Sequence, residues 1–301
     1  MILARRAGAP QGARPADPRR RTFWILALPP ALGLALFLVA PLLFMAALSF
    51  RTDLSGTLLA PFAPTLKHYA QLASTAPFLR SLGLSALTAL GVAAAATALA
   101  YPLAYYLAFR AGRRAAFYLV LLLVPFWTSY LLRVMAWKLM LGGEGVINSV
   151  LMSAGIVDEP IAALLYNRAA VIVTLVYVWI PFAALPILAA LGRVDVRLHD
   201  AAADLYATPF QQFRRVTLPL SLPGVIAAFL MVFIPTVGEY VTPLLVGGTS
   251  GTMYGNIIQD FFTRAANWPY GSALAMVMLV GTVALVAVGL RLVNPRRLLE
   301  R

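Results

Sequence analysis

Few side chains in this sequence have the chemistry of a catalyst, and they stand far apart along the chain. Cysteine is absent, which excludes thiolate nucleophiles, disulfides and cysteine-based metal sites. The two histidines, His68 and His199, fall in different segments between long apolar runs. No apolar run holds paired acids, HExxH or GxSxG. We therefore predict neither catalytic residues nor a metal site.

The acid with the most unusual surroundings is Glu239, which interrupts a long apolar run. A carboxylate within a membrane is costly, so an acid in that position is a functional candidate by default. Pro235 and Gly238, just before it, can bend a helix and expose backbone carbonyls, as transporters do beside a translocation path. Glu239 would then be the counter-ion of a cation. Ring faces for ammonium groups would come from Tyr240, Trp127, Trp137 and Trp179.

Each of these residues also has a purely structural interpretation. Glu239 lies near the far end of its predicted helix and would instead pair with Arg133 or Lys138. Tryptophan and tyrosine commonly form a belt at the membrane interface. Glu144 in "GGEG" is either part of a gate or a solvated loop acid.

The elements that must position these residues are membrane helices. The chain of 301 residues is 61% hydrophobic and 12% charged, which is too apolar for a soluble domain. A span needs about 20 helical residues. Apolar runs of sufficient length predict an all-α integral membrane protein with six transmembrane helices, at 23–50, 81–109, 115–141, 169–192, 221–246 and 271–293.

The net charge of +13 would suit nucleic acid, but in a membrane chain an arginine surplus more often marks cytoplasmic segments beside anionic lipid. With the N-terminus inside, 17 of the 24 basic residues fall in inner segments, so we predict that both termini are cytoplasmic and that no nucleic acid is bound. Residues 1–22 are predicted to be a disordered cytoplasmic tail. The first run is longer than a signal-peptide core and is predicted to be a retained helix. The outer gaps, at 51–80, 142–168 and 247–270, are long enough for surface helices or contacts with an external partner.

The inner segment 193–219 is predicted to form a helix-turn-helix. Residues 200–205 would be a short helix of low bulk, and Thr208, Pro209 and Gln211 have the pattern of a capping box that starts a second helix. A small-residue helix between charged residues fits a groove on a partner protein. An interfacial amphipathic helix that only anchors the loop is the alternative.

The same segment resembles the EAA loop of ABC-importer permeases. Asp200, Ala201 and Ala202 stand in the Glu-Ala-Ala positions, and Leu218 with Pro219 matches the Leu-Pro before the next span. Two departures are the shorter acid at position 200 and a tyrosine, Tyr206, at the position of the expected glycine. If the bend needs a left-handed backbone, a residue other than glycine costs about 1 kcal/mol there. The resemblance implies that the residues coupling this loop to an ATPase are Asp200, Ala201, Ala202, Leu205, Tyr206, Ala207, Phe213, Leu218 and Pro219.

Two further segments, Val124 to Asn148 and Pro235 to Phe262, resemble the spermidine/putrescine-type permeases in particular. This resemblance implies a type I (MetI-like) architecture in the bacterial inner membrane. It also implies that the chain is half of a pore completed by a second homologous permease, with two copies of an ATP-binding subunit and an extracytoplasmic solute-binding protein. The chain has no GxxxxGK[ST] loop, so we expect no cofactor of its own and ATP bound by partners.

Other functions stay open at this point. A self-contained secondary transporter would couple to protons or sodium through intramembrane acids, of which Glu239 is a single candidate. A membrane enzyme is a third class, opposed by the scattered histidines. Within the importer interpretation, another small solute is the alternative to a polyamine, because such importers often delegate selectivity to the binding protein.

Overall fold

The computed structural model of this chain describes residues 18–52 and 64–293, and the regular structure of these residues is helical. By its internal contacts the chain divides into two units, Met1–Leu48 and Ser49–Arg301. The first unit is one apolar helical run made of α1 (Pro18–Leu34), a π-helical turn (Ala35–Val39) and most of α2 (Ala40–Ser49). Ile25–Ser49 is long and apolar enough to cross a membrane. The predicted tail lies mostly outside the described residues, but its last residues, 18–22, already belong to α1, since proline suits a first helical turn.

The second unit holds the remaining helices. In chain order these are α3 (Lys67–Ser74), α4 (Ala76–Phe109), α5 (Ala115–Leu123), α6 (Tyr130–Leu141), α7 (Val146–Ser153), α8 (Arg168–Leu191), α9 (Arg197–Asp204), α10 (Pro209–Gln212), α11 (Leu218–Val237), α12 (Tyr254–Thr263) and α13 (Trp268–Val293). Short 3₁₀ turns at Gly112–Arg114, Val124–Trp127 and Ala162–Leu164, and π-helical turns at Phe213–Thr217 and Pro243–Gly247, lie between them.

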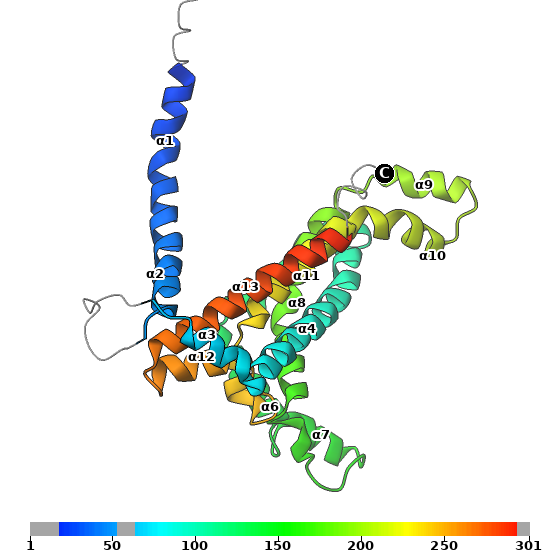
Figure 1. The fold of residues 1–301 in the computed structure, drawn as a ribbon. Coiled ribbons are helices and arrows are strands. Elements are labelled where there is room, and N and C mark those ends of the chain that lie inside the picture. The colour runs from blue at the N-terminus through cyan, green and yellow to red at the C-terminus, as the bar shows by residue number, and fades with distance from the viewer. Residues whose placement is uncertain (1–17, 53–63, 294–301) are drawn as a thin grey trace, which may run out of the picture. The chain divides into compact units, whose positions relative to one another are not determined.

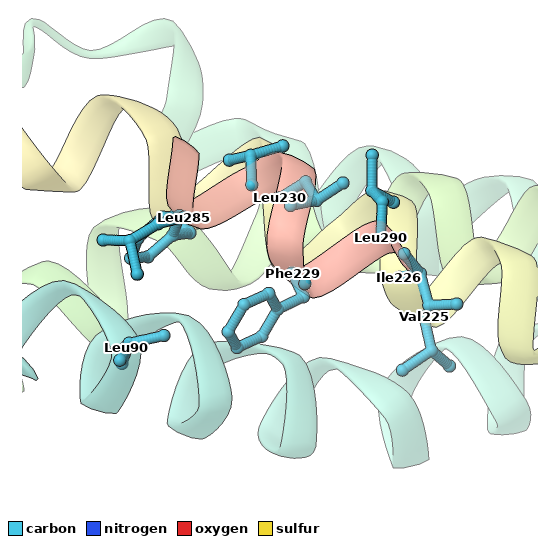
Figure 2. Close-up of a pocket in the computed structure, with 10 residues that line it drawn as sticks. Leu90, Val225, Ile226, Phe229, Leu230, Leu285 and Leu290 are labelled. Atoms are coloured by element: carbon cyan, nitrogen blue, oxygen red, sulfur yellow. The ribbon is translucent and has the colours of Figure 1, made fainter. Parts of the chain in front are cut away.

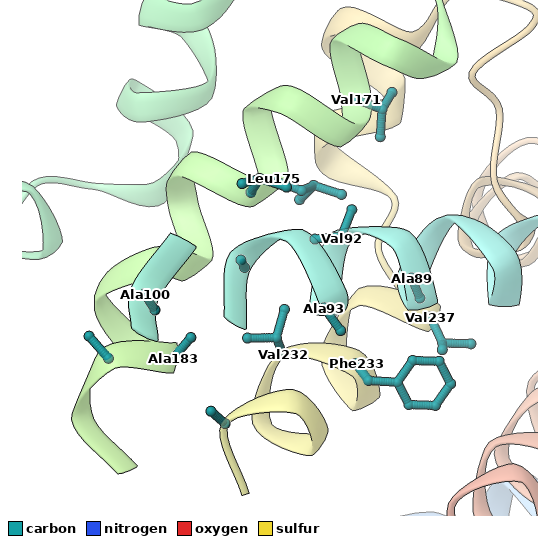
Figure 3. Close-up of a cluster of buried hydrophobic side chains, with 14 of the residues drawn as sticks. Ala89, Val92, Ala93, Ala100, Val171, Leu175, Ala183, Val232, Phe233 and Val237 are labelled. Atoms are coloured by element: carbon teal, nitrogen blue, oxygen red, sulfur yellow. The ribbon is translucent and has the colours of Figure 1, made fainter. Parts of the chain in front are cut away.

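Three of these helices, α4, α8 and α11, form the core of the second unit (Figure 3). On α4, alanines recur every three or four residues at Ala89, Ala93, Ala96, Ala100 and Ala104, and all five are fully buried. Small residues on one face let helix backbones approach closely, which is the main source of packing energy between helices in lipid. The larger side chains of the core come mainly from the other two helices and include Val171, Leu175, Val232, Phe233 and Val237.

The closest approach between α8 and α11 depends on Gly224. A Cβ atom at this position would stand 2.4 Å from the Cβ of Ala190 and 2.6 Å from the carbonyl oxygen of Pro186. Both distances are shorter than real contacts, so no other residue fits without a shift of the helices. The two helices are therefore locked together next to the segment that joins them.

The predicted apolar runs are all present, but two of them are not the continuous helices expected. Among the described residues, five helices are long and apolar enough to span a membrane, and the third predicted run is a bent pair, Gly112–Trp127 and Tyr130–Ser153, at an angle of 87°. Pro125 lacks an amide donor, and the Thr128 hydroxyl bonds to its carbonyl at 2.7 Å, which ends the first arm.

The prediction of a helix over 221–246 is also wrong at its far end. The helix ends at Val237, where Gly238 terminates it. The helical run begins earlier than expected, at Pro209, and therefore includes α10 and the π-helical turn. The helix is thus interrupted at residues 238–240, which places Glu239 in a helix break.

Candidate functional site

The segment predicted to couple to an ATPase, residues 193–219, projects from the second unit as two short helices joined by a turn (Figure 1). The second helix, α10, begins with a complete capping box: the Thr208 hydroxyl accepts the Gln211 amide at 3.3 Å, and the Gln211 side chain accepts the Thr208 amide at 3.0 Å. These bonds satisfy amide groups that the start of a helix otherwise leaves unpaired. The capping box therefore fixes the start of α10 through bonds that are local in the sequence.

The turn after α9 is a Schellman motif. The amide of Ala207 bonds to the carbonyl of Ala202 at 3.0 Å, and the amide of Tyr206 bonds to that of Ala203 at 2.8 Å. Tyr206 occupies the left-handed position with a φ of 57°. Glycine is usual there, because any side chain costs about 1 kcal/mol in this conformation. The bend at Tyr206, where the resemblance leads us to expect glycine, therefore does have a left-handed backbone.

The loop is fastened to the core through its second half. The ring of Phe213 lies edge-on to Tyr101 and Tyr105 of α4, with centroids 5.7 and 6.1 Å apart. His199 on α9 shares a hydrogen bond of 2.9 Å with the buried hydroxyl of Thr217. Aromatic pairs of this geometry contribute about 0.5–1.5 kcal/mol each beyond their buried area. The loop thus contacts α4 directly and continues without a gap into α11.

The tip of the loop exposes apolar side chains. Leu205, Tyr206 and Phe210 are 81%, 94% and 68% exposed. Large apolar groups gathered in the open are typical of a surface that binds a partner. Of the other residues predicted to couple, Asp200, Ala201 and Pro219 are exposed, whereas Ala202, Ala207, Phe213 and Leu218 are partly buried.

The second predicted site centres on Glu239, at the opposite end of α11. Its carboxylate accepts the amides of Val241 at 2.9 Å and Thr242 at 3.2 Å, so it caps the helical turn that follows the break. A carboxylate that holds two backbone amides keeps accepting capacity on its second oxygen. It therefore has a structural role and retains a site for an ammonium donor.

The surroundings of Glu239 contain residues that sequence reasoning missed. The Tyr130 hydroxyl at the start of α6 bonds to the Thr242 hydroxyl at 2.6 Å and lies beside the Glu239 carboxylate. Asn256 on α12 donates to the carbonyl of Tyr240 at 2.7 Å. Gly255 permits this contact, since a Cβ there would lie 2.6 Å from the carbonyl oxygen of Gly238. The available signal was the segment "GGTSGTMYGN", rich in small and polar residues, which follows the apolar "PLLV".

The ion pair considered for Glu239 is not formed. Within residues 18–52 and 64–293 the single salt bridge joins Arg264 to Asp260. Arg133 instead lies over the rings of Phe126 and Tyr130, at 5.8 and 5.9 Å, and Lys138 lies over Tyr166 at 5.8 Å. Both cations are thus stabilised by aromatic faces. No three His, Cys, Asp or Glu side chains of the described chain gather to hold a metal ion.

The four aromatic residues predicted to accompany Glu239 do not form one cage. Trp137 on α6 packs on Tyr177 of α8 with centroids 5.4 Å apart. Trp179 packs on Phe182 and has a buried indole N–H without a partner. Trp127 is 74% exposed at the bend before α6, and Tyr240 is 43% exposed beside Glu239. The Trp137–Tyr177 pair joins α6 to α8, whereas the Trp179–Phe182 pair lies within α8 and Trp127 has neither contact.

A cavity of about 290 Å³ lies between α4, α11 and α13 (Figure 2). The side chains that line it are apolar, among them Leu90, Phe229 and Leu285. An ammonium group there would lose its hydration without gaining a partner, which costs several kcal/mol or more. This cavity is therefore not a cation path.

Known proteins are similar to this chain along nearly all of its length. The family described as "Binding-protein-dependent transport system inner membrane component" matches residues 18–299. The chain is 36% identical over 256 residues to the spermidine/putrescine transport system permease protein PotB of Haemophilus influenzae, covering 85% of this chain and 88% of that protein. It is 33% identical to PotB of Escherichia coli over 258 residues, covering 84% and 92%. It is 32% identical to the inner membrane ABC transporter permease protein YdcU of Escherichia coli over 278 residues, covering 83% and 87%.

Solved structures share the fold at low sequence identity. A chain of a bacterial ABC transporter involved in the import of the acidic polysaccharide alginate matches with a TM-score of 0.68 at 15% identity, over 92% of this chain and 96% of that chain. The alginate transporter in complex with a periplasmic protein bound to an alginate pentasaccharide matches with a TM-score of 0.69 at 16% identity, over 90% and 93%. The predicted MetI-like importer-permease architecture is thereby confirmed.

Proposed function

The chain belongs to the family of binding-protein-dependent inner-membrane transport components, and from that premise we propose that it carries a polyamine of the spermidine or putrescine kind into the cell. Membership makes the protein a membrane-embedded transport subunit of an ABC importer and not an enzyme. The self-contained secondary transporter considered above is thereby set aside. The single observation that carries the substrate class is the 36% identity to a spermidine/putrescine permease over 85% of this chain.

The break at Glu239 fits a cationic substrate chemically. The carboxylate has no salt-bridge partner among the described residues, and Tyr130 and Tyr240 stand beside it. A primary ammonium group would gain a charge-assisted hydrogen bond from Glu239 and a ring face from a tyrosine. We assign Glu239 the role of counter-ion on the translocation path, with Tyr240 next to it. Trp137 packs α6 against α8 through Tyr177.

The loop at 193–219 is assigned to the ATPase. Its exposed tip, built from Leu205, Tyr206 and Phe210, would enter a groove on an ATP-binding subunit, and Phe213 would transmit the movement to α4. This assignment places the loop and both chain ends in the cytoplasm, in agreement with the arginine distribution. ATP would be bound by two copies of that subunit.

Two further partners complete the transporter as we propose it. A second homologous permease would supply the other half of the pore. An extracytoplasmic solute-binding protein would deliver the polyamine. The alginate transporter of the same fold was solved with such a periplasmic protein bound, which supports this arrangement.

Isolation of the tagged chain from its native membrane tests the assembly. We expect an ATP-binding subunit and a second permease to co-purify, and uptake of radiolabelled spermidine or putrescine in liposomes to require ATP. Ala202→Arg at the loop should abolish both ATPase recovery and uptake. Ala265→Arg is the matched control, because Ala265 is an exposed alanine that lies outside the loop. Equal recovery of the ATPase with both variants would contradict the loop assignment.

Glu239→Gln tests the substrate path. The amide keeps a carbonyl oxygen that can accept backbone amides, so the fold of the break should persist while the negative charge is lost. The KM for a diamine should rise by roughly tenfold, about 1.4 kcal/mol, which is the scale of one charge-assisted hydrogen bond. Unchanged kinetics in a correctly assembled complex would remove Glu239 from the path.

A further inference from the structure

An open polar basin lies at the end of α4 and α8 that is opposite to the loop at 193–219. Its volume is about 740 Å³. The polar and charged residues that line it come from α4, α8 and the turn after the Pro243–Gly247 segment. They are Arg80, Ser81, Arg168, Thr249, Ser250 and Thr252. Neither the loop at 193–219 nor the substrate path proposed above uses any of them.

The basin carries positive charge that nothing in the described part of the chain neutralises. Neither Arg80 nor Arg168 forms a salt bridge with a described residue, and no acid is among the residues that line the basin. Arg168 donates from Nη2 to the carbonyl of Ser250 at 3.2 Å, while its buried Nε has no partner. The N-terminus of α4, a helix of 34 residues, also opens here at Ala76 and adds its partial positive charge.

Residues 247–252 form one wall of the basin, and glycines fix the backbone conformation of this segment. Gly248 has a φ of 56°, and a Cβ there would stand 2.6 Å from the carbonyl oxygen of Tyr166. A Cβ on Gly251 would stand 2.5 Å from the backbone of Gly247. Only glycine permits this tight turn, which brings Thr249, Ser250 and Thr252 to the basin that Arg80 and Arg168 also line. Such a set of donors is suited to an anionic oxygen group such as a carboxylate.

We propose that this basin receives a surface carboxylate of the extracytoplasmic solute-binding protein. The inference rests on the proposed function, which places this end of α4 and α8 outside the cytoplasm. A protein that carries a polyammonium ion must hold it with carboxylates, so the rim of its cleft is acidic and complementary to two unpaired arginines. The basin is open and much larger than a small inorganic anion, whereas a protein surface would both present the carboxylate and cover the opening.

Docking of the purified binding protein to the whole transporter in nanodiscs tests this proposal. The probe is the polyamine-loaded binding protein of the same transport system, titrated by biolayer interferometry. The double variant Arg80→Gln/Arg168→Gln should weaken docking at least tenfold and flatten its dependence on salt, because two charge pairs are lost. Each single variant should weaken it by a smaller factor.

Two control variants distinguish the loss of positive charge from a loss of folding or assembly. Arg80→Lys/Arg168→Lys keeps both charges and should stay within a few-fold of the parent. Arg264→Gln removes a cation that is exposed and already paired with Asp260, and should leave docking within twofold. Recovery of the ATPase with every variant confirms that the complex has assembled. A double Gln variant that assembles and docks with the parent's affinity overturns the proposal while the transport function stands.

The outcomes also identify the occupant. If inorganic phosphate or phosphatidylglycerol vesicles raise the Tm of the parent complex but not of the double variant, and docking of the binding protein is unchanged, the basin is a free-anion or lipid site and the proposal fails. If the parent complex contains no ATPase and moves no polyamine, the proposed function itself is wrong. Loss of docking in the Gln variant with retention in the Lys variant supports a carboxylate of the binding protein.

Discussion

A substitution at Tyr206 gives the most discriminating prediction. The backbone conformation of this residue destabilises the loop, whereas its side chain is proposed to stabilise the docked complex. It occupies the left-handed position of the Schellman turn, and its side chain is 94% exposed. Tyr206→Gly should relieve about 1 kcal/mol of strain and slow amide exchange in α9 by up to fivefold. Interface backbones of pre-organised complexes move little on binding, so we expect this relief to cancel from the docking equilibrium.

The loss of the ring does not cancel. An aromatic anchor at the centre of an interface typically costs about 2 kcal/mol or more when truncated, which is about thirtyfold in Kd. We therefore expect Tyr206→Gly to stabilise the loop yet weaken its affinity for the ATP-binding subunit, as titrated against the permease pair in nanodiscs. Tyr206→Phe keeps the ring and the strain and should bind as the parent does. Parental affinity in the glycine variant would refute the role of the ring, and faster exchange in α9 would refute the strain argument.

Three other substitutions test the connections between the sites. Phe213→Ala removes two ring contacts to α4, so the ATPase should still bind while ATP hydrolysis and uptake become uncoupled, measured as the ratio of the two rates. Gly224→Val places methyl groups where a Cβ already overlaps Ala190, and should lower the Tm of the purified complex by several degrees or prevent assembly. Asn256→Ala removes the buried donor to the Tyr240 carbonyl and should cost about 1–3 kcal/mol, read as a lower Tm together with reduced uptake.

Local signals allowed the loop to be predicted in detail. The pattern Thr208-Pro209-x-Gln211 predicts the capping box directly, and both hydrogen bonds of the capping box are present. The left-handed turn could be stated only as a condition, since tyrosine has no preference for that conformation. What holds Tyr206 there is the pair of backbone bonds to Ala202 and Ala203, which the sequence does not reveal.

Hydropathy predicted the presence of the spans but not where they break. An apolar run looks the same whether its helix is continuous or bent, so the angle of 87° after Trp127 and the helix end at Val237 were both missed. Pro125 and Gly238 were visible, but prolines also lie within α8 without ending it. The partners of Glu239 come from α6 and α12, far away in sequence, and only the fold brings them together.

The helix breaks and the core together explain how a displacement of the loop at 193–219 can affect the region around Glu239. α11, about 30 Å long by helical rise, begins beside the loop at Thr217 and ends at the Glu239 break. α4 runs alongside it, contacts Phe213 near one end and bonds through Ser85 to the amide of Tyr254 near the other, at 2.7 Å. Since the alanine-rich core between these helices is close-packed, it is expected to tilt as one body rather than deform. The movement must then be absorbed where the helices are interrupted, after Trp127 and at residues 238–242, which is where the carboxylate proposed to meet the polyamine stands.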